Sequence, residues 1–276
     1  MRVLVTGSTG FIGSHVIEYL RSLNLDVIEA IQNSDENNIS SKRKFNIELF
    51  YDNVNLCEYF NKPDVLIHLA WWGLPDYTSD IHLNQVQQHY RFIKNLIKGG
   101  LGKVVVVGTC QEYGMKNGML KEDIAVEPHT NYAVAKNNLR LLIEDFRKEN
   151  VFNFNWVRLF YMYGRGQNPK SILPLLDAAI KSGQTVFNMS PGDQKRDYLP
   201  VEKVAEYIVK IALQVNYNGI VNCCSGKPIT VTSLVEEHIR RNNSQIKLNK
   251  GFYNYPTYEP FEFWGDNSLM KKIINI

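Results

Sequence analysis

The sequence predicts an α/β fold, in which a doubly wound parallel sheet is followed by a smaller α/β C-terminal lobe. Short β-branched runs such as Val3–Val5 and Val104–Val107 alternate with helix-length segments over the first 160 residues. Glycines follow the first of these runs, and Pro and Gly interrupt the chain after about residue 160. Continuous β-branched runs suit strands that are buried on both faces, and short connections through helices give right-handed crossovers between parallel strands.

The elements follow from this alternation in chain order. Strands are expected at 2–6, 26–31, 64–69, 103–109 and 153–160, with a weaker one near 46–50, and helices at 11–23, 81–98 and 131–148. Later helices are expected at 171–182, 201–213 and 231–241, while the aromatic tail at 251–265 is expected to be irregular. We therefore divide the chain into a sheet domain at 1–160 and a second lobe at 161–276, some of whose elements return to the sheet.

Composition excludes several classes of protein. The 276 residues are 44% hydrophobic and 21% charged, with a formal net charge of +3. These values are near the averages of globular proteins, and so slight an excess of positive charge predicts no binding of nucleic acid. No stretch reaches the roughly 20 apolar residues of a membrane helix, and we expect no signal peptide and no membrane partner. The four cysteines form no CxxC, so we expect no metal site and a reducing, cytoplasmic location.

A glycine turn between the first strand and the first helix is the strongest local signal. Its spacing is GxxGxxG, at Gly7, Gly10 and Gly13. The first glycine permits a tight turn, the second lets the backbone approach a pyrophosphate, and the third lets the helix pack closely on the sheet. A plain strand-to-helix turn is the alternative, but the position directly after a strand favours a dinucleotide-binding Rossmann-type domain. Thr9, Phe11 and Ile12 would be further cofactor contacts.

The end of the second strand bears on the choice of dinucleotide. An acid at this point selects NAD, whereas a basic residue accommodates the extra phosphate of NADP. Glu29 comes two or three positions early, and Ser34 and the triplet at 42–44 offer phosphate contacts, although a solvated loop explains that triplet equally well. NADP(H) is therefore favoured, with NAD(H) as the alternative. Asp52 is a candidate contact for the adenine amino group.

The pattern YxxxK occurs twice, at Tyr90/Lys94 and at Tyr132/Lys136. The first pair lies inside a predicted helix, away from any strand end, whereas Tyr132 begins a helix that follows the strand ending at Thr109. Residues four apart share one helix face, so the Lys136 ammonium is expected to lower the pKa of the Tyr132 phenol from about 10. Ligands bind at the carboxyl ends of strands in such sheets, so the Thr109 hydroxyl is expected to contact the same substrate oxygen.

These motifs together resemble the extended short-chain dehydrogenase/reductases, which include sugar-nucleotide epimerases, dehydratases and ketoreductases. The matching stretches are Thr6–Gly13, His68–Ala70, Thr109, Tyr132–Lys136 and Arg196–Tyr198. The resemblance implies that Tyr132 is the catalytic acid/base, that Lys136 tunes it and binds the nicotinamide ribose, and that Thr109 orients the substrate. It also implies that Leu69, Ala70 and Phe160 line the cofactor and that His68 is structural. The second lobe would bind a nucleotide sugar.

Departures from the family pattern bear on the reaction. Cys110 and Gln111 stand where the 4,6-dehydratases carry an Asp and a Glu, so dehydration is disfavoured. Tyr161 stands where epimerases usually have an Asn. Arg196 matches an arginine that grips the substrate diphosphate, as a guanidinium can, although an ion pair with a nearby acid is the alternative. By the same resemblance, the residues that would line the substrate pocket also include Trp71, Cys110, Gln111 and Tyr161.

Several stretches are similar to bacterial 4-ketoreductases that act on nucleotide-linked 4-keto-6-deoxyhexoses. They are Trp71–Pro75, Thr109–Gly114 and Tyr258–Pro260. This similarity implies NAD(P)H-dependent reduction of a C4 ketone, with dTDP as the favoured nucleotide, in the synthesis of O-antigen or capsule sugars. An NAD-dependent 4-epimerase is the alternative, and a non-catalytic dinucleotide-binding protein is disfavoured by the intact Tyr–Lys pair. The predicted helices 81–98 and 131–148 carry apolar stripes that suit a homodimer, although burial within one chain explains them nearly as well.

Overall fold

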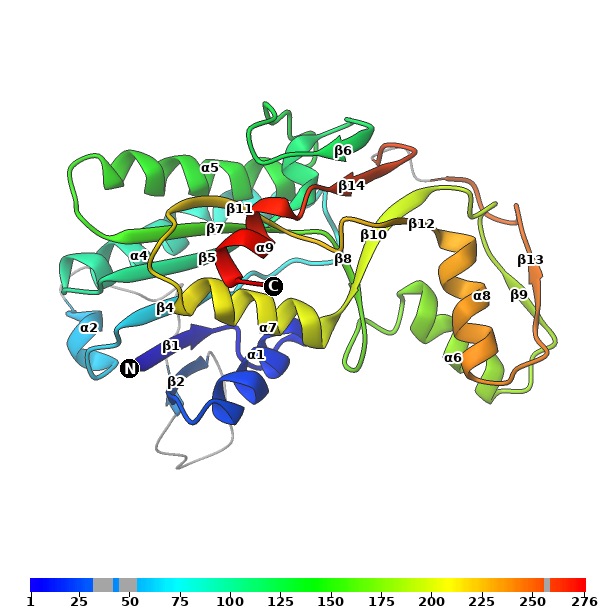
Figure 1. The fold of residues 1–276 in the computed structure, drawn as a ribbon, viewed down its shortest axis with the longest axis horizontal. Helices are drawn as coiled ribbons and strands as arrows, with labels where there is room; N and C mark the ends of the chain where they lie inside the picture. The colour runs from blue at the N-terminus through cyan, green and yellow to red at the C-terminus, as the bar shows by residue number, and fades with distance from the viewer. Residues whose placement is uncertain (32–41, 45–53, 256–258) are drawn as a thin grey trace.

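The computed structural model describes residues 1–31, 42–44, 54–255 and 259–276, with the backbone alone for 42–44. Seven parallel strands form the central sheet, in the order β11-β7-β5-β4-β1-β2-β3. Their bounds are β1 Arg2–Thr6, β2 Asp26–Ile31, β3 Lys42–Lys44, β4 Val65–His68, β5 Lys103–Thr109, β7 Asn153–Leu159 and β11 Gly219–Cys223. This sheet confirms the predicted Rossmann-type fold (Figure 1).

Helices cover both faces of the sheet. On one face lie α1 (Phe11–Ser22), α7 (Val201–Leu213) and α9 (Ser268–Ile274); on the other lie α2 (Leu56–Tyr59), α4 (Val86–Lys98) and α5 (Asn131–Arg147), with α3 (Ile81–Asn84) against α5. The strands serve both layers because successive side chains point to opposite faces. Val3 and Val5 pack under α1 and α7, whereas Leu4 between them packs under α4.

Most strands and helices of the first 160 residues agree with the sequence predictions. The strands at 2–6, 26–31 and 103–109 are confirmed to the residue. The predicted helix at 81–98 is divided into α3 and α4 at Gln85, whose side chain bonds to backbone groups outside the helix. The weak strand near 46–50 lies outside the described residues.

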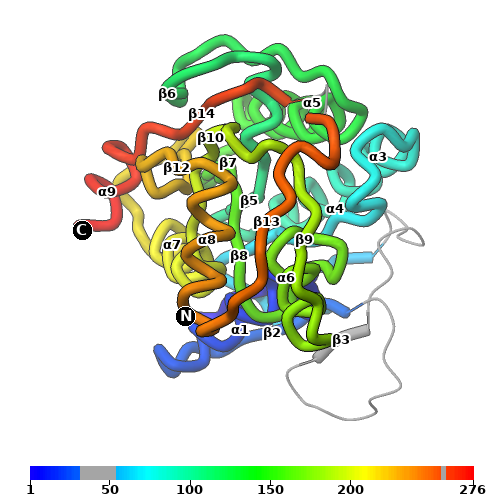
Figure 2. Tube along the Cα trace, turned by 90° about the vertical axis from the view of Figure 1, so that its right-hand side faces the viewer, coloured from blue at the N-terminus to red at the C-terminus, as the bar shows by residue number. Residues whose placement is uncertain are grey.

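The second part of the chain builds a small lobe at the carboxyl end of the sheet. It contains a three-stranded sheet of β8 (Tyr161–Tyr163), β10 (Lys195–Pro200) and β12 (Pro228–Thr230), and a pair of β9 (Val186–Asn188) with β13 (Lys247–Asn249). The helices α6 (Ile172–Lys181) and α8 (Val231–Arg241) pack with β9 around a separate apolar core. Figure 2 shows β9, β13, α6 and α8 together at the end of the molecule that faces the viewer.

Three elements after residue 160 return to the large sheet. β11 extends it next to β7, and α7 and α9 cover one face (Figure 1). The tail that was expected to be irregular contains β14 (Phe263–Gly265), which pairs with β6 (Gly118–Leu120). The expectation of an irregular tail is therefore wrong at its end, because β6 supplies the backbone partners that the tail's own sequence does not reveal.

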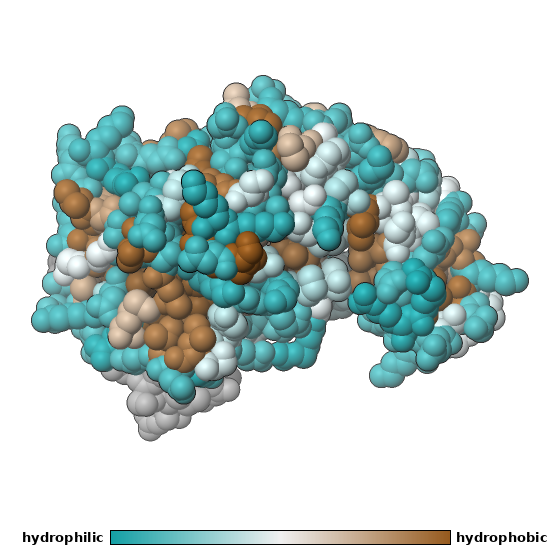
Figure 3. Space-filling view, viewed as in Figure 1, coloured by the Kyte–Doolittle hydropathy of each residue, from teal (hydrophilic) through white to brown (hydrophobic). Residues whose placement is uncertain are grey.

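The surface agrees with the ordinary composition. Figure 3 shows mostly hydrophilic residues on the face that carries α7, with an apolar area near the carboxyl end of that helix. Within the described part of the chain, no helix has both the length and the apolar character needed to span a membrane.

Candidate functional site

The glycine turn brings β1, α1 and the end of β4 into close contact. Gly7 has a positive φ of 71°, and a Cβ there would lie 2.7 Å from the backbone nitrogen of Ala70. A Cβ on Gly13 would lie 2.0 Å from the carbonyl oxygen of Gly7. Both positions therefore exclude any side chain. The turn has the tight geometry that the sequence predicts.

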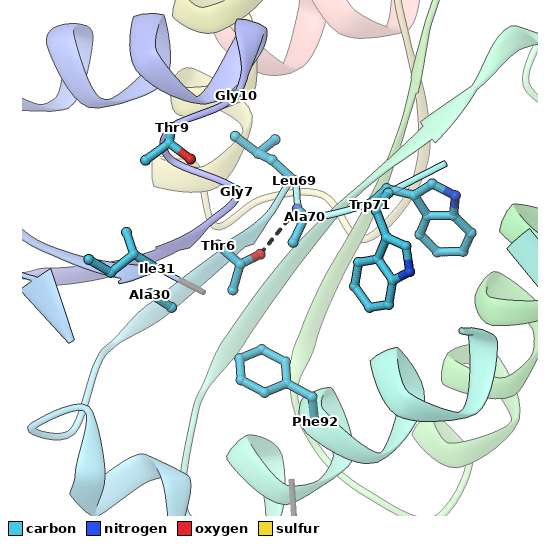
Figure 4. A pocket seen from close by; sticks show the side chains of 11 residues that line it. Thr6, Gly7, Thr9, Gly10, Ala30, Ile31, Leu69, Ala70, Trp71 and Phe92 are labelled. Carbon is cyan, nitrogen blue, oxygen red and sulfur yellow. Dashed lines mark hydrogen bonds between the residues drawn. The ribbon is translucent and has the colours of Figure 1, made fainter. Parts of the chain in front are cut away.

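A cavity of about 260 Å³ opens beside this turn (Figure 4). Its walls come from the glycine turn, the end of β2 and the end of β4, together with two indoles and one phenyl ring. The lining residues are Thr6, Gly7, Thr9, Gly10, Ala30, Ile31, Leu69, Ala70, Trp71, Trp72 and Phe92. Five of the predicted cofactor contacts, Gly7, Thr9, Gly10, Leu69 and Ala70, thus line one cavity.

The cavity fits a dinucleotide. No side chain caps the N-terminus of α1 at Gly10, so the amides of its first turn are free to face an anion. The buried Ser8 hydroxyl has no hydrogen-bond partner among the described residues, which leaves a polar atom in the turn for a ligand. The described residues contain no group of three or more His, Cys, Asp or Glu side chains arranged to hold a metal ion.

Other predicted cofactor contacts lie elsewhere. Phe11, Ile12 and Gly13 belong to α1 and do not line the cavity, and the ring of Phe160 packs with Tyr113 and Phe263 in a separate apolar cluster. Asp52 and Ser34 lie outside the described residues.

The end of β2 presents apolar groups to the cavity. Glu29 is buried and accepts a hydrogen bond of 2.7 Å from Arg21 of α1, so it does not serve as the ribose-binding acid. Ala30 and Ile31 line the cavity instead. Because the side chains at 42–44 are not described, the prediction of phosphate contacts from that triplet stays a prediction.

The structure brings Thr109, Tyr132 and Lys136 together. The Thr109 side chain lies close enough to the phenol of Tyr132, in the first turn of α5, to favour its ionised form. The Lys136 ammonium donates to the carbonyl oxygen of Val107 at 2.9 Å and lies 5.9 Å from the centre of the Tyr132 ring. The Tyr90/Lys94 pair differs, because the Lys94 ammonium lies 5.5 Å from the Phe146 ring, between two helices and away from the ends of the strands.

Burial sets the charge states of Tyr132 and Lys136. It raises the pKa of Tyr132, with smaller contributions from Tyr77, Glu112 and Cys110, and the nearby Thr109 side chain offsets only part of this rise. Burial also lowers the pKa of Lys136 to about 7. The expected lowering of the Tyr132 pKa is therefore wrong for this structure. The spacing places the two side chains on one face, but desolvation outweighs the field of an ammonium that is itself half neutral near pH 7.

Sequence reasoning missed the role of Glu112. Its carboxylate accepts hydrogen bonds from the Thr109 amide at 2.9 Å, from the Trp156 indole at 2.9 Å and from the Arg158 guanidinium at 2.9 Å. The carboxylate is fully buried, and it closes a capping box with Thr109 at the start of the short helix η2 (Cys110–Tyr113). The Thr-x-x-Glu spacing was the available signal. Glu112 therefore positions Thr109 and has no free oxygen for chemistry.

A second pocket lies on the lobe side of Thr109. It is lined by Cys110, Gln111, Gly114, His129, Thr130, Glu259, Pro260 and Phe263. Burial raises the pKa of the Cys110 thiol, which therefore stays protonated. Gln111 accepts a hydrogen bond from Thr130 at 3.2 Å. Neither side chain offers a carboxylate to this pocket.

Arg196 lies beside this pocket in a buried ion pair. Its guanidinium is 2% exposed, bonds to Glu259 at 3.0 Å and donates to the carbonyl oxygen of Phe261 at 2.9 Å. Tyr161 donates to the other oxygen of Glu259 at 2.5 Å. The alternative of an ion pair with an acid is thus what the structure shows, although the pair is buried rather than on the surface. A diphosphate contact at Arg196 stays a prediction that requires this pair to open.

Sheet order, glycine turn and Tyr–Lys pair together define a dinucleotide-binding α/β protein. The model of the NAD dependent epimerase/dehydratase family matches residues 3–224. The chain therefore belongs to this family, and the resemblance seen in the sequence is confirmed.

Curated relatives match over most of the chain. A dTDP-6-deoxy-L-talose 4-dehydrogenase (NAD(+)) of Aggregatibacter actinomycetemcomitans is 28% identical, over 96% of this chain and 99% of the relative. A GDP-6-deoxy-D-talose 4-dehydrogenase of the same organism is 25% identical, over 92% and 85%. A putative UDP-glucose 4-epimerase of Methanocaldococcus jannaschii is 27% identical, over 85% and 80%.

Solved structures share the fold. MoeE5 in complex with UDP-glucuronic acid and NAD is 22% identical, with a TM-score of 0.85 over 100% of this chain and 93% of that one. UDP-N-acetylglucosamine 4-epimerase from Methanobrevibacter ruminantium M1 is 23% identical, with a TM-score of 0.85 over 100% and 92%. Likeness at this identity establishes the fold alone.

Proposed function

We propose that the protein is an NAD(P)H-dependent reductase of the C4 ketone in a nucleotide-linked 4-keto-6-deoxyhexose. The observation that carries this proposal is a buried Tyr132 whose raised pKa keeps the phenol protonated beside Thr109. A protonated phenol is the donor that carbonyl reduction needs at the start of the reaction. The two 4-dehydrogenase relatives support it, because ketone reduction is the reverse of the reaction in their names.

Each side chain has a distinct task in this reaction. When bound, the nicotinamide dinucleotide supplies the hydride to C4. Tyr132 donates its phenolic proton to the oxygen on C4, and the Thr109 hydroxyl, which lies near the phenol, orients that oxygen. Lys136 in its charged form stabilises the negative charge left on the phenolic oxygen.

The second pocket argues against dehydration. Elimination of water needs an acid and a base beside the catalytic threonine. Cys110 is a buried thiol, Gln111 is an amide, and the carboxylate of Glu112 is saturated by Thr109, Trp156 and Arg158. None of these three side chains can therefore act as the acid or the base of an elimination.

The comparisons and the end of β2 bear on the choice of cofactor, and one relative bears on the nucleotide of the substrate. The family description and the dTDP-linked relative name NAD, whereas the described end of β2, at Ala30 and Ile31, carries no ribose-binding acid, which is compatible with NADP(H). We propose a dTDP-linked substrate because that relative aligns with nearly the whole chain. A cytoplasmic place in the synthesis of O-antigen or capsule sugars completes the proposal.

A 4-epimerase is the second candidate, and the putative UDP-glucose 4-epimerase relative supports it. An epimerase oxidises and re-reduces the same carbon, so it shows no net consumption of its dinucleotide. A reductase consumes one reduced dinucleotide per turnover. Stoichiometry therefore separates the two candidates.

A coupled assay tests the proposal. The purified protein is mixed with dTDP-4-keto-6-deoxyglucose and either NADPH or NADH, and the absorbance of the reduced nicotinamide is followed. We expect one reduced dinucleotide to be consumed for each ketone reduced. The rate of this consumption should fall by about 10²-fold or more in Tyr132→Phe, because the proton donor is gone. The matched control is Tyr90→Phe in the other YxxxK pair, which should keep full activity. No loss with either dinucleotide, together with NAD that copurifies with the protein, would move the assignment to an epimerase.

A further inference from the structure

A chain of buried hydrogen bonds runs beside the dinucleotide cavity. The Thr6 hydroxyl bonds to Nδ1 of His68 at 2.8 Å, and Nε2 of His68 bonds to Nδ1 of His89 at 2.8 Å. Nε2 of His89 then bonds to Oε1 of Gln85 at 3.0 Å. All four side chains are buried, and they join β1, β4 and the start of α4.

The backbone of Trp72 sets the direction of every bond in this chain. Its amide donates to Oε1 of Gln85 at 3.3 Å, and its carbonyl accepts from Nε2 of Gln85 at 3.0 Å, so the amide orientation is determined. Since Oε1 only accepts, Nε2 of His89 carries the proton. Nδ1 of His89 then accepts from His68, whose own Nδ1 accepts from Thr6. These directions hold with both imidazoles neutral, and burial favours that state because it lowers the pKa of His68 to about 3 and that of His89 well below its usual value.

Trp71 is held against this chain. Its indole stacks on the His89 ring with centroids 4.7 Å apart and an interplanar angle of 13°. The indole nitrogen donates to Nδ1 of His82 at 3.1 Å, and Nε2 of His82 bonds to the carbonyl oxygen of Asp76 at 2.6 Å. Figure 4 shows Trp71 across the cavity from Thr9, at the end of β4. Two independent contacts thus fix the plane and the direction of the indole.

The fixed indole lies next to the Lys136 ammonium. Nζ of Lys136 is 4.0 Å from the centre of the Trp71 ring, and an aromatic face at this distance stabilises a cation, most of all where water is excluded. The titratable groups that face Lys136 are Tyr132 on α5, Glu112 on η2, His68 on β4 and His89 on α4. The two imidazoles are neutral, and Glu112 is paired with Arg158.

We propose that Trp71 is a positioning residue for Lys136, held in place by the hydrogen-bonded chain through His68, His89 and Gln85. The indole keeps the ammonium charged and directed toward Tyr132 in an environment that otherwise favours the neutral amine. The inference rests on the proposed function in one respect, namely that Lys136 serves Tyr132 in catalysis. The contact between Trp71 and Lys136 itself does not depend on the substrate.

A direct titration of Lys136 tests the contact. The protein without substrate or dinucleotide is labelled with ¹³C at the lysine ε-carbons, and the Lys136 signal is identified by its loss in Lys136→Met. We expect a midpoint of about 7 in the wild type and a fall of about one pKa unit in Trp71→Leu. Trp71→Phe keeps an aromatic face and should restore most of the shift. His89→Leu, which removes the ring under the indole, should shift the midpoint in the same direction.

The control uses the other aromatic–lysine pair. Tyr90→Leu removes a ring that lies 5.6 Å from the Lys94 ammonium and should leave the Lys136 midpoint unchanged. Thermal unfolding of each variant establishes that it is folded. An unchanged Lys136 midpoint in folded Trp71→Leu would overturn the inference.

The titration tests the contact between Trp71 and Lys136, whereas the coupled assay tests the proposed reaction, so a negative result in one does not decide the other. If the assay shows reduction, the alkaline limb of the kcat profile in Trp71→Leu should move to lower pH by the shift that the titration measures. A shifted titration with no ketone reduction would leave the contact standing and remove the proposed reaction. Reduction by the wild type with no shift in the titration would remove the inference alone.

Discussion

Single residues in this molecule owe their charge states mainly to burial. The pKa of Tyr132 is raised and that of Lys136 falls to about 7, although the two side chains lie on one helix face. The YxxxK spacing indicates which residues meet, but it carries no information on how much water reaches them. Desolvation depends on the packing of α5 against β5. A protonated phenol follows, and it is the reason for favouring reduction.

Two of the buried histidines, His68 and His89, make stability depend on pH. Burial lowers the pKa of His68 to about 3 and that of His89 well below its usual value, so both stay neutral in the folded protein. In the unfolded chain each takes a proton below about pH 6.5. The stability they provide is therefore complete above this pH and is lost as the pH falls. From pH 6.5 to 5.5 we expect the free energy of unfolding to drop by about 1 kcal/mol for each histidine.

Urea unfolding at a series of pH values measures this slope. Because His68→Gln lacks one of the two groups, its stability should fall less steeply with pH, whatever its stability at pH 7. Exposed His129 supplies the control, since His129→Gln should leave the slope as it is. An equally steep slope in His68→Gln would contradict the prediction.

At the level of elements, the short helix η2 depends on one buried ion pair. Glu112 and Arg158 lie 2.9 Å apart and are both buried, so Glu112→Gln would leave the guanidinium without its counter-charge. We expect a loss of about 3 kcal/mol in the free energy of unfolding, measured in urea. Turnover should also fall, because the Thr109 amide loses its carboxylate partner.

A double-variant cycle separates the ion pair from general damage. The variant Glu112→Gln with Arg158→Met removes both charges, so its loss of stability should be clearly smaller than the sum of the two single losses. Strictly additive losses would mean that the two residues act independently, against the geometry.

The strands and helices also show which parts of the structure can be predicted from the sequence. Strands β1, β2 and β5 are predicted to the residue because their own β-branched runs mark them. β14 and α9 are too short to carry such a pattern, and they form because β6 and the core under α7 are already there. Thr109, Tyr132 and Lys136 were found by motif. His89 was not, and Glu259 was found only as part of a matched stretch without its pairing to Arg196, because both roles depend on contacts with residues distant in the chain.

On the scale of the whole molecule, the chain leaves the large sheet for the lobe twice and returns to it twice. α7 and β11 return to the sheet after residue 160, and the segment before β14 carries Glu259 back to Arg196. The C-terminal tail therefore lines the second pocket with Glu259, and Arg196 of β10 in the lobe pairs with that glutamate. The division at residue 160 stays a prediction about which part binds which ligand, while the sheet itself draws on both parts.

The proposed homodimer is the last test at this scale. Phe92, Ile93 and Leu96 of the α4 stripe pack against the chain's own sheet, so they supply no intersubunit contact. Leu141 on α5 remains 48% exposed, and we propose it as the apolar anchor for a partner's α4 and α5. We expect a mass in solution of twice the 31.8 kDa of one chain, measured by light scattering. Leu141→Asp should halve that mass, whereas Val215→Asp, at a 72% exposed site following α7, should leave it unchanged. A wild-type mass of 31.8 kDa at every concentration would show that the apolar stripes of α4 and α5 pack only within one chain.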